Sequence, residues 1–144
     1  MDVIPLILIV EDDDTLRYVV VRQLRKLGYP AHYAVNGREA LRMVKEHSYS
    51  LILMDIMMPA MDGFEATAQI RLFEQQQGQE HTPIIALTAY QDKARCAEAG
   101  MDDYLFKPVT MDELKKKLSE WLPLNGSESL PKALDKHDER ADFL

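Results

Sequence analysis

The sequence predicts an α/β fold in which five parallel strands alternate with five helices. Short apolar runs, each closed by polar or turn-forming residues, are typical of strands buried on both faces. Apolar residues at helical spacing fill the intervals, and this alternation specifies a parallel sheet covered on both faces with right-handed crossovers. The expected strands are residues 6–10, 31–35, 51–55, 83–88 and 104–106.

Capping residues, turn residues and glycines mark the expected helices. We expect Asp14 to cap the first helix, Gly28 to end it and Thr110 to cap the last one. The expected helices cover residues 15–27, 38–46, 64–76, 92–99 and 111–122. The apolar residues at helical spacing are Leu16, Val19, Val20, Leu24 and Leu27 in the first helix and Leu114, Leu118, Trp121 and Leu122 in the last.

The composition is that of one globular domain. The chain has 144 residues, of which 47% are apolar and 28% charged, and no apolar run approaches the roughly 18 residues that a membrane span needs. Its net charge of −7 argues against binding to nucleic acid, and we expect no membrane insertion. Cys96 is the single cysteine, so no internal disulfide can form and a cytoplasmic location is expected. The basic run Lys115-Lys116-Lys117 is expected to be a solvated helix face.

The last part of the chain differs in character from the rest. Residues 123–144 begin with a polar segment and continue with many charged residues, so we expect a poorly ordered linker or tail after a domain spanning residues 1–122. The histidines show no metal-ligand spacing and are expected to be solvated; they are His32, His47, His81 and His137.

Polar residues gather where the expected strands end. Glu11 and Asp12 follow the first strand, Asp55 ends the third, Thr88 ends the fourth and Lys107 follows the fifth. The carboxyl ends of parallel strands form one edge of the sheet, where ligands bind. Three carboxylates brought close repel one another unless a cation joins them.

These residue types predict a magnesium site that handles a phosphoryl group. Carboxylate oxygens suit Mg²⁺, with Asp12 and Asp55 as direct ligands, Glu11 holding a metal-bound water and the backbone carbonyl of Met57 completing the set. Mn²⁺ could substitute for it. An ammonium and a hydroxyl beside the ion would each neutralise an oxygen of a transferring group, so the economical interpretation is that Asp55 itself accepts a phosphoryl group.

These residues, in this order, closely resemble the receiver domain of two-component response regulators, from about residue 6 to residue 122. The motifs that carry the resemblance are specific in combination: ILIVEDD, LILMDIMMPAMDG, PIIALTA and DDYLFKP. The resemblance implies a flavodoxin-like sheet of strand order 2-1-3-4-5 and a cis peptide bond between Lys107 and Pro108. The segment MDIMMPAMDGFEAT is similar to the corresponding segment in the receiver domains of hybrid histidine kinases.

The resemblance also implies a two-state switch. Asp55 would be the phosphoacceptor, with Lys107 beside it. A phosphoryl oxygen would draw the Thr88 hydroxyl inward, and Tyr104 would move from an exposed to a buried position, changing the face made by the fourth helix, fifth strand and fifth helix. Met57 and Tyr90 stand at two positions that modulate the lifetime of the phosphorylated form in this family. The chain is expected to catalyse its own phosphorylation. Because neither Met57 nor Tyr90 is an acid or an amide that could position a water, its dephosphorylation is expected to be slow.

The expected partners are proteins. The phosphoryl donor would be a histidine kinase or a histidine phosphotransfer protein, docking near Leu16 and Val20 of the first helix, and a downstream protein would bind the switched face. An alternative is an aspartyl-phosphate hydrolase of the haloacid dehalogenase type, although Met57 occupies the position of its second aspartate. A flavin- or nucleotide-binding module would need a phosphate loop where the acidic residues after the first strand stand. A receiver that binds partners without phosphorylation also remains an alternative.

Overall fold

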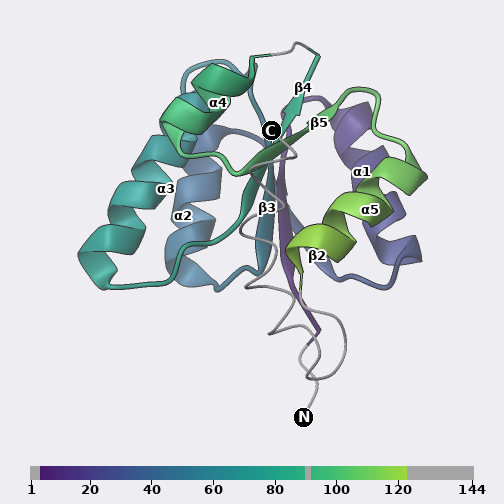
Figure 1. The fold of residues 1–144 in the computed structure, drawn as a ribbon, viewed down its shortest axis with the longest axis horizontal. Helices are drawn as coiled ribbons and strands as arrows, with labels where there is room; N and C mark the ends of the chain where they lie inside the picture. The colour runs from purple at the N-terminus through teal and green to yellow at the C-terminus, as the bar shows by residue number, and fades with distance from the viewer. Residues whose placement is uncertain (1–3, 90–91, 123–144) are drawn as a thin grey trace.

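Five parallel strands form one sheet of order β2-β1-β3-β4-β5, flanked by five helices (Figure 1). The structure is a computed structural model, and it describes residues 4–89 and 92–122. The predicted tail and Tyr90 lie outside the described residues. The strands are β1 (Ile7–Val10), β2 (Ala31–Ala34), β3 (Leu51–Asp55), β4 (Ile84–Thr88) and β5 (Asp103–Phe106). The helices are α1 (Asp14–Lys26), α2 (Gly37–Glu46), α3 (Gly63–Gln77), α4 (Lys93–Ala99) and α5 (Met111–Trp121). The predicted fold class and strand order are confirmed.

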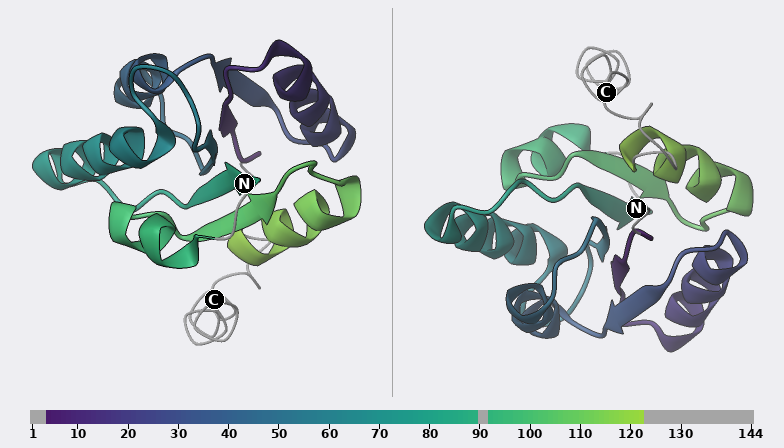
Figure 2. Two further views of the ribbon diagram at one scale, coloured as in Figure 1. Left: turned by 90° about the horizontal axis from the view of Figure 1, so that it is seen from above. Right: turned by 90° about the horizontal axis from the view of Figure 1, so that it is seen from below.

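The helices cover the two faces of the sheet unequally. Helices α1 and α5 lie on one face, and α2, α3 and α4 lie on the other (Figures 1 and 2). Successive side chains of a strand point to opposite faces, so Ile7 and Ile9 join the core under α1 and α5 while Leu8 and Val10 join the second core. All four are fully buried, which explains why the first strand is apolar without alternation. No helix in the described part of the chain has the length and apolar character of a membrane span.

Side-chain caps set the helix starts. The Thr110 cap is confirmed, because its hydroxyl accepts a hydrogen bond from the Glu113 amide at 3.2 Å. The Asp14 cap is wrong by one residue. Asp13 Oδ1 accepts the Leu16 amide at 2.8 Å, and Asp14 is instead the first helical residue, where its carboxylate pairs with Arg17. An acid in the first turn still favours the positive end of the helix.

Two expectations about helix faces are wrong. Val19 of α1 is 41% exposed, because Val20 and Val21 beside it occupy the buried face. Lys117 of α5 is not part of a solvated face: its Nζ lies 2.8 Å from Oδ2 of the buried Asp103. The same oxygen accepts the Trp121 indole N–H at 2.8 Å. A buried carboxylate requires such partners, and Lys117 and Trp121 supply them for Asp103.

Candidate functional site

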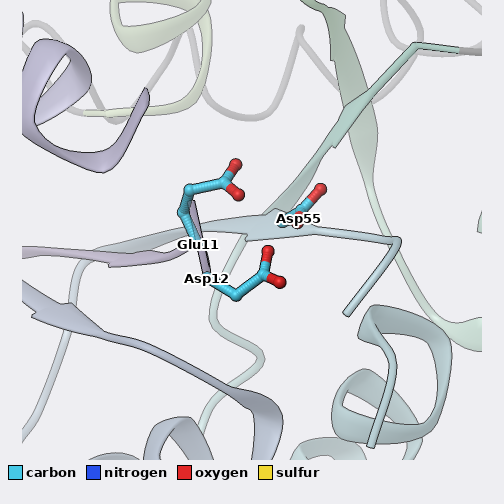
Figure 3. A group of neighbouring side chains, drawn as sticks. All are labelled: Glu11, Asp12 and Asp55. Atoms are coloured by element: carbon cyan, nitrogen blue, oxygen red, sulfur yellow. The ribbon is translucent and has the colours of Figure 1, made fainter. Parts of the chain in front are cut away.

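Strand register brings three carboxylates to one place. Strands β1 and β3 are neighbours at the centre of the sheet, and Val10 pairs with Met54. Glu11, Asp12 and Asp55 therefore emerge at the same edge, where one carboxylate oxygen from each lies within 4.8 Å of the others (Figure 3). Glu11 and Asp55 are buried while Asp12 is exposed. The predicted acidic cluster is thus present.

Lys107 enters this cluster from the end of β5. Its Nζ donates to Asp55 Oδ1 at 2.6 Å and lies 3.1 Å from Glu11 Oε1. The backbone holds it there, because the Lys107 N–H donates to the Thr88 carbonyl at 2.8 Å and so joins the ends of β5 and β4. The Lys107–Pro108 peptide bond is cis, as the resemblance implied. Lys107 therefore counters the charge of both buried acids.

One lysine does not neutralise three carboxylates. Burial raises the pKa of Glu11 to about 7, and the charge of Asp55 adds to this effect. Burial also raises the pKa of Asp55, against the opposing effect of Lys107. Burial alone would lower the pKa of Lys107, but its hydrogen bond to Asp55 and the charges of both buried acids together raise it. The cluster holds more negative charge than its surroundings stabilise, which favours a cation.

The donor set fits a magnesium ion. All three side chains offer carboxylate oxygens, the hard ligands that Mg²⁺ prefers. Glu11 Oε1 is buried, and the ammonium of Lys107 forms an ion pair with it. Among the described residues, however, no group donates a hydrogen bond to this oxygen. Met57 lies in the loop that follows β3 and is 68% exposed. The ligand role of its backbone carbonyl stays a prediction.

The loop after Asp55 approaches that residue so closely that it requires a glycine. A Cβ atom at Gly63 would lie 2.2 Å from the Asp55 carbonyl oxygen. The Gly63 N–H donates to the Ile56 carbonyl at 2.9 Å, which fixes the start of α3 beneath the acceptor strand. Ala60 has a left-handed φ of 68°, an unusual conformation for a residue with a side chain. The sequence offered no signal for Ala60, whereas the Asp62-Gly63 turn was visible.

The two predicted switch residues lie on adjacent strands. Thr88 ends β4 and is 6% exposed. Tyr104 on β5 is half-buried, with its ring 5.0 Å from that of Phe106. Two ammonium groups that the sequence analysis missed flank this ring, Lys93 of α4 at 5.5 Å and Lys117 of α5 at 5.8 Å. Tyr104 thus lies between the two helices of the predicted output face.

Comparison with known proteins identifies this arrangement. A family model for the response regulator receiver domain matches residues 7–119. The chain belongs to this family. The hybrid signal transduction protein dokA of Dictyostelium discoideum is 51% identical over 116 residues, which make up 81% of this chain and 7% of that protein. This receiver domain therefore spans only a small part of the length of that curated relative.

Solved receiver domains have the same fold. The receiver domain of Ssk1 from Saccharomyces cerevisiae, crystallised with the histidine phosphotransfer protein Ypd1, matches with 38% identity and a TM-score of 0.77, covering 83% of this chain and 91% of that one. The receiver domain of the Pseudomonas aeruginosa sensor histidine kinase PA1611, with magnesium in its active-site cleft, matches with 39% identity and a TM-score of 0.72, covering 83% and 98%. The chain is thus a receiver domain of phosphorelay signalling, and the hydrolase alternative has no support.

Of the two docking residues expected on α1, Val20 is wrong and Leu16 stays a prediction. Val20 is fully buried in the core, and Leu16 is half-buried against the same core. The exposed apolar residues of this helix are instead Tyr18, at 61%, and Val19, at 41%. The two valines are adjacent in the sequence, so helical spacing alone did not decide which one faces solvent.

Proposed function

We propose that Asp55 of this receiver domain accepts a phosphoryl group and thereby controls the binding of a partner protein. The observation that carries the proposal is the hydrogen bond of 2.6 Å from Lys107 Nζ to Asp55 Oδ1, which lies inside a cluster of three carboxylates. An aspartate nucleophile needs its own negative charge, and also positive groups for the charge of the incoming phosphoryl oxygens. Lys107 supplies one such group, and the acidic cluster attracts the second as a metal ion.

The reaction is a transfer between two nucleophiles. A carboxylate oxygen of Asp55 forms a bond to phosphorus as the phosphorus–nitrogen bond of a phosphohistidine breaks, and the leaving imidazole retains the electron pair. Asp12, Asp55 and the Met57 carbonyl would hold Mg²⁺ directly and Glu11 would hold it through a metal-bound water, and the ion would supply positive charge for the phosphoryl oxygens. Mn²⁺ has similar ligand preferences and would substitute. In the same site the acyl phosphate hydrolyses slowly.

The phosphorylated state is read through Thr88 and Tyr104. A hydrogen bond from the Thr88 hydroxyl to a phosphoryl oxygen draws that side chain toward Asp55 and opens space beside β4. The Tyr104 ring then moves inward, away from Lys93 and Lys117, which now flank it at 5.5 and 5.8 Å. The face formed by α4, β5 and α5 changes shape and charge, and a downstream protein distinguishes the two states.

The phosphoryl donor is a histidine phosphotransfer protein or a histidine kinase. Tyr18 and Val19 of α1 and Met57 near Asp55 are exposed apolar residues on the elements that surround the acceptor. The relative Ssk1 was crystallised with such a phosphotransfer protein. The acidic net charge of −7 disfavours nucleic acid as a partner, and these roles are those of a cytoplasmic domain.

Labelling with a small phosphodonor tests the acceptor. The chain is incubated with acetyl phosphate and Mg²⁺, and the modified residue is located by mass spectrometry. We expect one phosphoryl group on Asp55, none in Asp55→Asn, and full labelling of the control Asp112→Asn, which removes an exposed acid from α5. Labelling of Asp55→Asn at the rate of the unmodified chain would overturn the proposal.

A second experiment separates docking from chemistry. Val19→Asp places a charge on the exposed part of α1 without removing a core residue. We expect slower transfer from a phosphorylated histidine phosphotransfer protein and unchanged labelling by acetyl phosphate. Equal loss with both donors would mean that the substitution damages the acceptor site, and unchanged transfer would exclude α1 from the docking surface.

A further inference from the structure

Two histidines that are far apart in the sequence lie together at the other end of the sheet from Asp55. His32 is the second residue of β2 and pairs in register with Leu8, near the start of β1. His47 is the C-cap of α2. Their ring centroids are 5.0 Å apart, and Tyr49 stands close to both, at 5.6 Å from His32 and 5.9 Å from His47. The expectation of scattered histidines is wrong for this pair, whereas the expected exposure to solvent is confirmed for His47.

The two rings meet edge to face, with an interplanar angle of 76°, and their separation also suits imidazoles that share one ion. With zinc–nitrogen bonds of about 2.0–2.1 Å and a tetrahedral angle, the centroids of two bound imidazoles lie about 5 Å apart. His32 is half-buried and His47 is exposed, so the pair is open to solvent on one side. A hollow of about 440 Å³ is lined by His47, Tyr49 and Glu80, whereas His32 does not line it. Water can therefore complete the coordination of an ion held there.

The Tyr49 phenol orients one of the rings. Its oxygen lies 2.8 Å from His32 Nδ1. When Nδ1 carries the proton and donates it to this oxygen, Nε2 keeps its lone pair for a metal. Histidine ligands are usually held by such a bond from their other ring nitrogen. Burial raises the pKa of Tyr49 to about 12, so the phenol stays neutral and orients the ring without binding the ion itself.

We infer that His32 and His47 form a binding site for a divalent ion of the zinc and copper class, with Tyr49 as the residue that positions His32. Imidazole nitrogen suits these ions, whereas the carboxylate cluster at Asp55 suits Mg²⁺. The carboxylate of Glu46 lies close enough to contribute to the raised pKa of Tyr49, and Arg42, which pairs with that carboxylate at 3.2 Å, opposes this effect. Such an ion would tie the edge strand β2 to the segment after α2, independently of phosphorylation.

Calorimetric titration of the full chain with Zn²⁺ tests the site. Excess Mg²⁺ keeps the acidic cluster occupied, and Asp12→Asn serves as a second check that zinc does not bind there. We expect one zinc ion per chain, with affinity reduced at least about tenfold in His47→Gln and about tenfold in Tyr49→Phe, the usual range for loss of an orienting partner. His81→Gln is the matched control, because His81 pairs with Asp102 elsewhere in the fold and should leave the affinity unchanged.

Ring nitrogen resonances give a readout that stability does not affect. At one equivalent of Zn²⁺, the nitrogens of His32 and His47 should shift together while those of His81 do not. His47 is exposed, so His47→Gln should fold normally and needs only a check of its thermal transition without zinc. Equal affinity in His47→Gln and the unmodified chain, or loss of binding in Asp12→Asn, would overturn the inference.

Discussion

Removing the charge of Glu11 should stabilise the metal-free protein. Glu11 is 1% exposed, and its pKa rises from an ordinary 4.5 to about 7 in the folded chain. A carboxyl group whose folded pKa is raised holds its proton more tightly in the folded state than in the unfolded one. Its ionised form therefore weakens the fold, and this cost is absent below the unfolded pKa and complete above the folded one. Glu11→Gln replaces the carboxylate with a neutral group of the same shape.

The size of the effect follows from the two pKa values. Each unit of difference corresponds to about 1.4 kcal/mol, and 7 minus 4.5 leaves 2.5 units. Glu11→Gln should thus raise the free energy of unfolding by about 3 kcal/mol near pH 8 and about 2 kcal/mol near pH 6. Near pH 4.5, where half of the unfolded chains already carry the proton, the gain should fall below about 1 kcal/mol.

Urea denaturation in the presence of a chelator measures these differences. Glu98→Gln is the control, because it removes the same charge from an exposed position on α4 and should change stability little at any pH. A gain that is equal at all three pH values, or a Glu11→Gln protein that is less stable near pH 8, would refute the reasoning. Added Mg²⁺ should stabilise the unmodified chain more than the variant, because the ion and the ionised carboxylate favour each other.

Three further substitutions test single contacts. Gly63→Ala should cost about 3 kcal/mol in urea denaturation, because its Cβ would lie 2.2 Å from the Asp55 carbonyl; an unchanged midpoint would contradict this contact. Asp103→Ala should cost about 3 kcal/mol by the same measurement, because it leaves the Lys117 ammonium without its buried carboxylate; a change within error would mean that the pair is not buried in solution. Met57→Asn should shorten the lifetime of the acyl phosphate severalfold, since an amide can position water beside Asp55; unchanged decay after removal of the donor would exclude that role.

The three central strands of the sheet, β1, β3 and β4, could be predicted because they are buried on both faces. A run such as Ile7–Val10 has no polar alternation, so the runs 51–54 and 84–87 stand out in the same way. The site followed from the topology, because parallel strands place their carboxyl ends at one edge whichever neighbours they have. Asp55 and Lys107 are 52 residues apart in the sequence, yet strand order alone brings them to that edge.

Choices between adjacent residues could not be predicted. Asp12, Asp13 and Asp14 offer the same side chain at three successive positions, and only the geometry of the chain leaving β1 decides that Asp13 caps α1. Val19 and Val20 present the same difficulty, since a rotation of one residue exchanges the exposed and buried valines. Periodicity locates a helix face to within about one residue, which is too coarse to identify a docking residue.

Side-chain pairs away from the strand ends were also beyond the sequence. His32 and His47 are separated by a whole helix, and no spacing rule relates a strand residue to the cap of the helix that follows it. They meet because α2 returns along the sheet, so its last turn ends beside the early residues of β2. The crossover that gathers the acids at one end of the sheet must also bring helix ends to the other end. The amino end of a receiver sheet is therefore a place where chemically useful residues can gather without any sequence motif to reveal them.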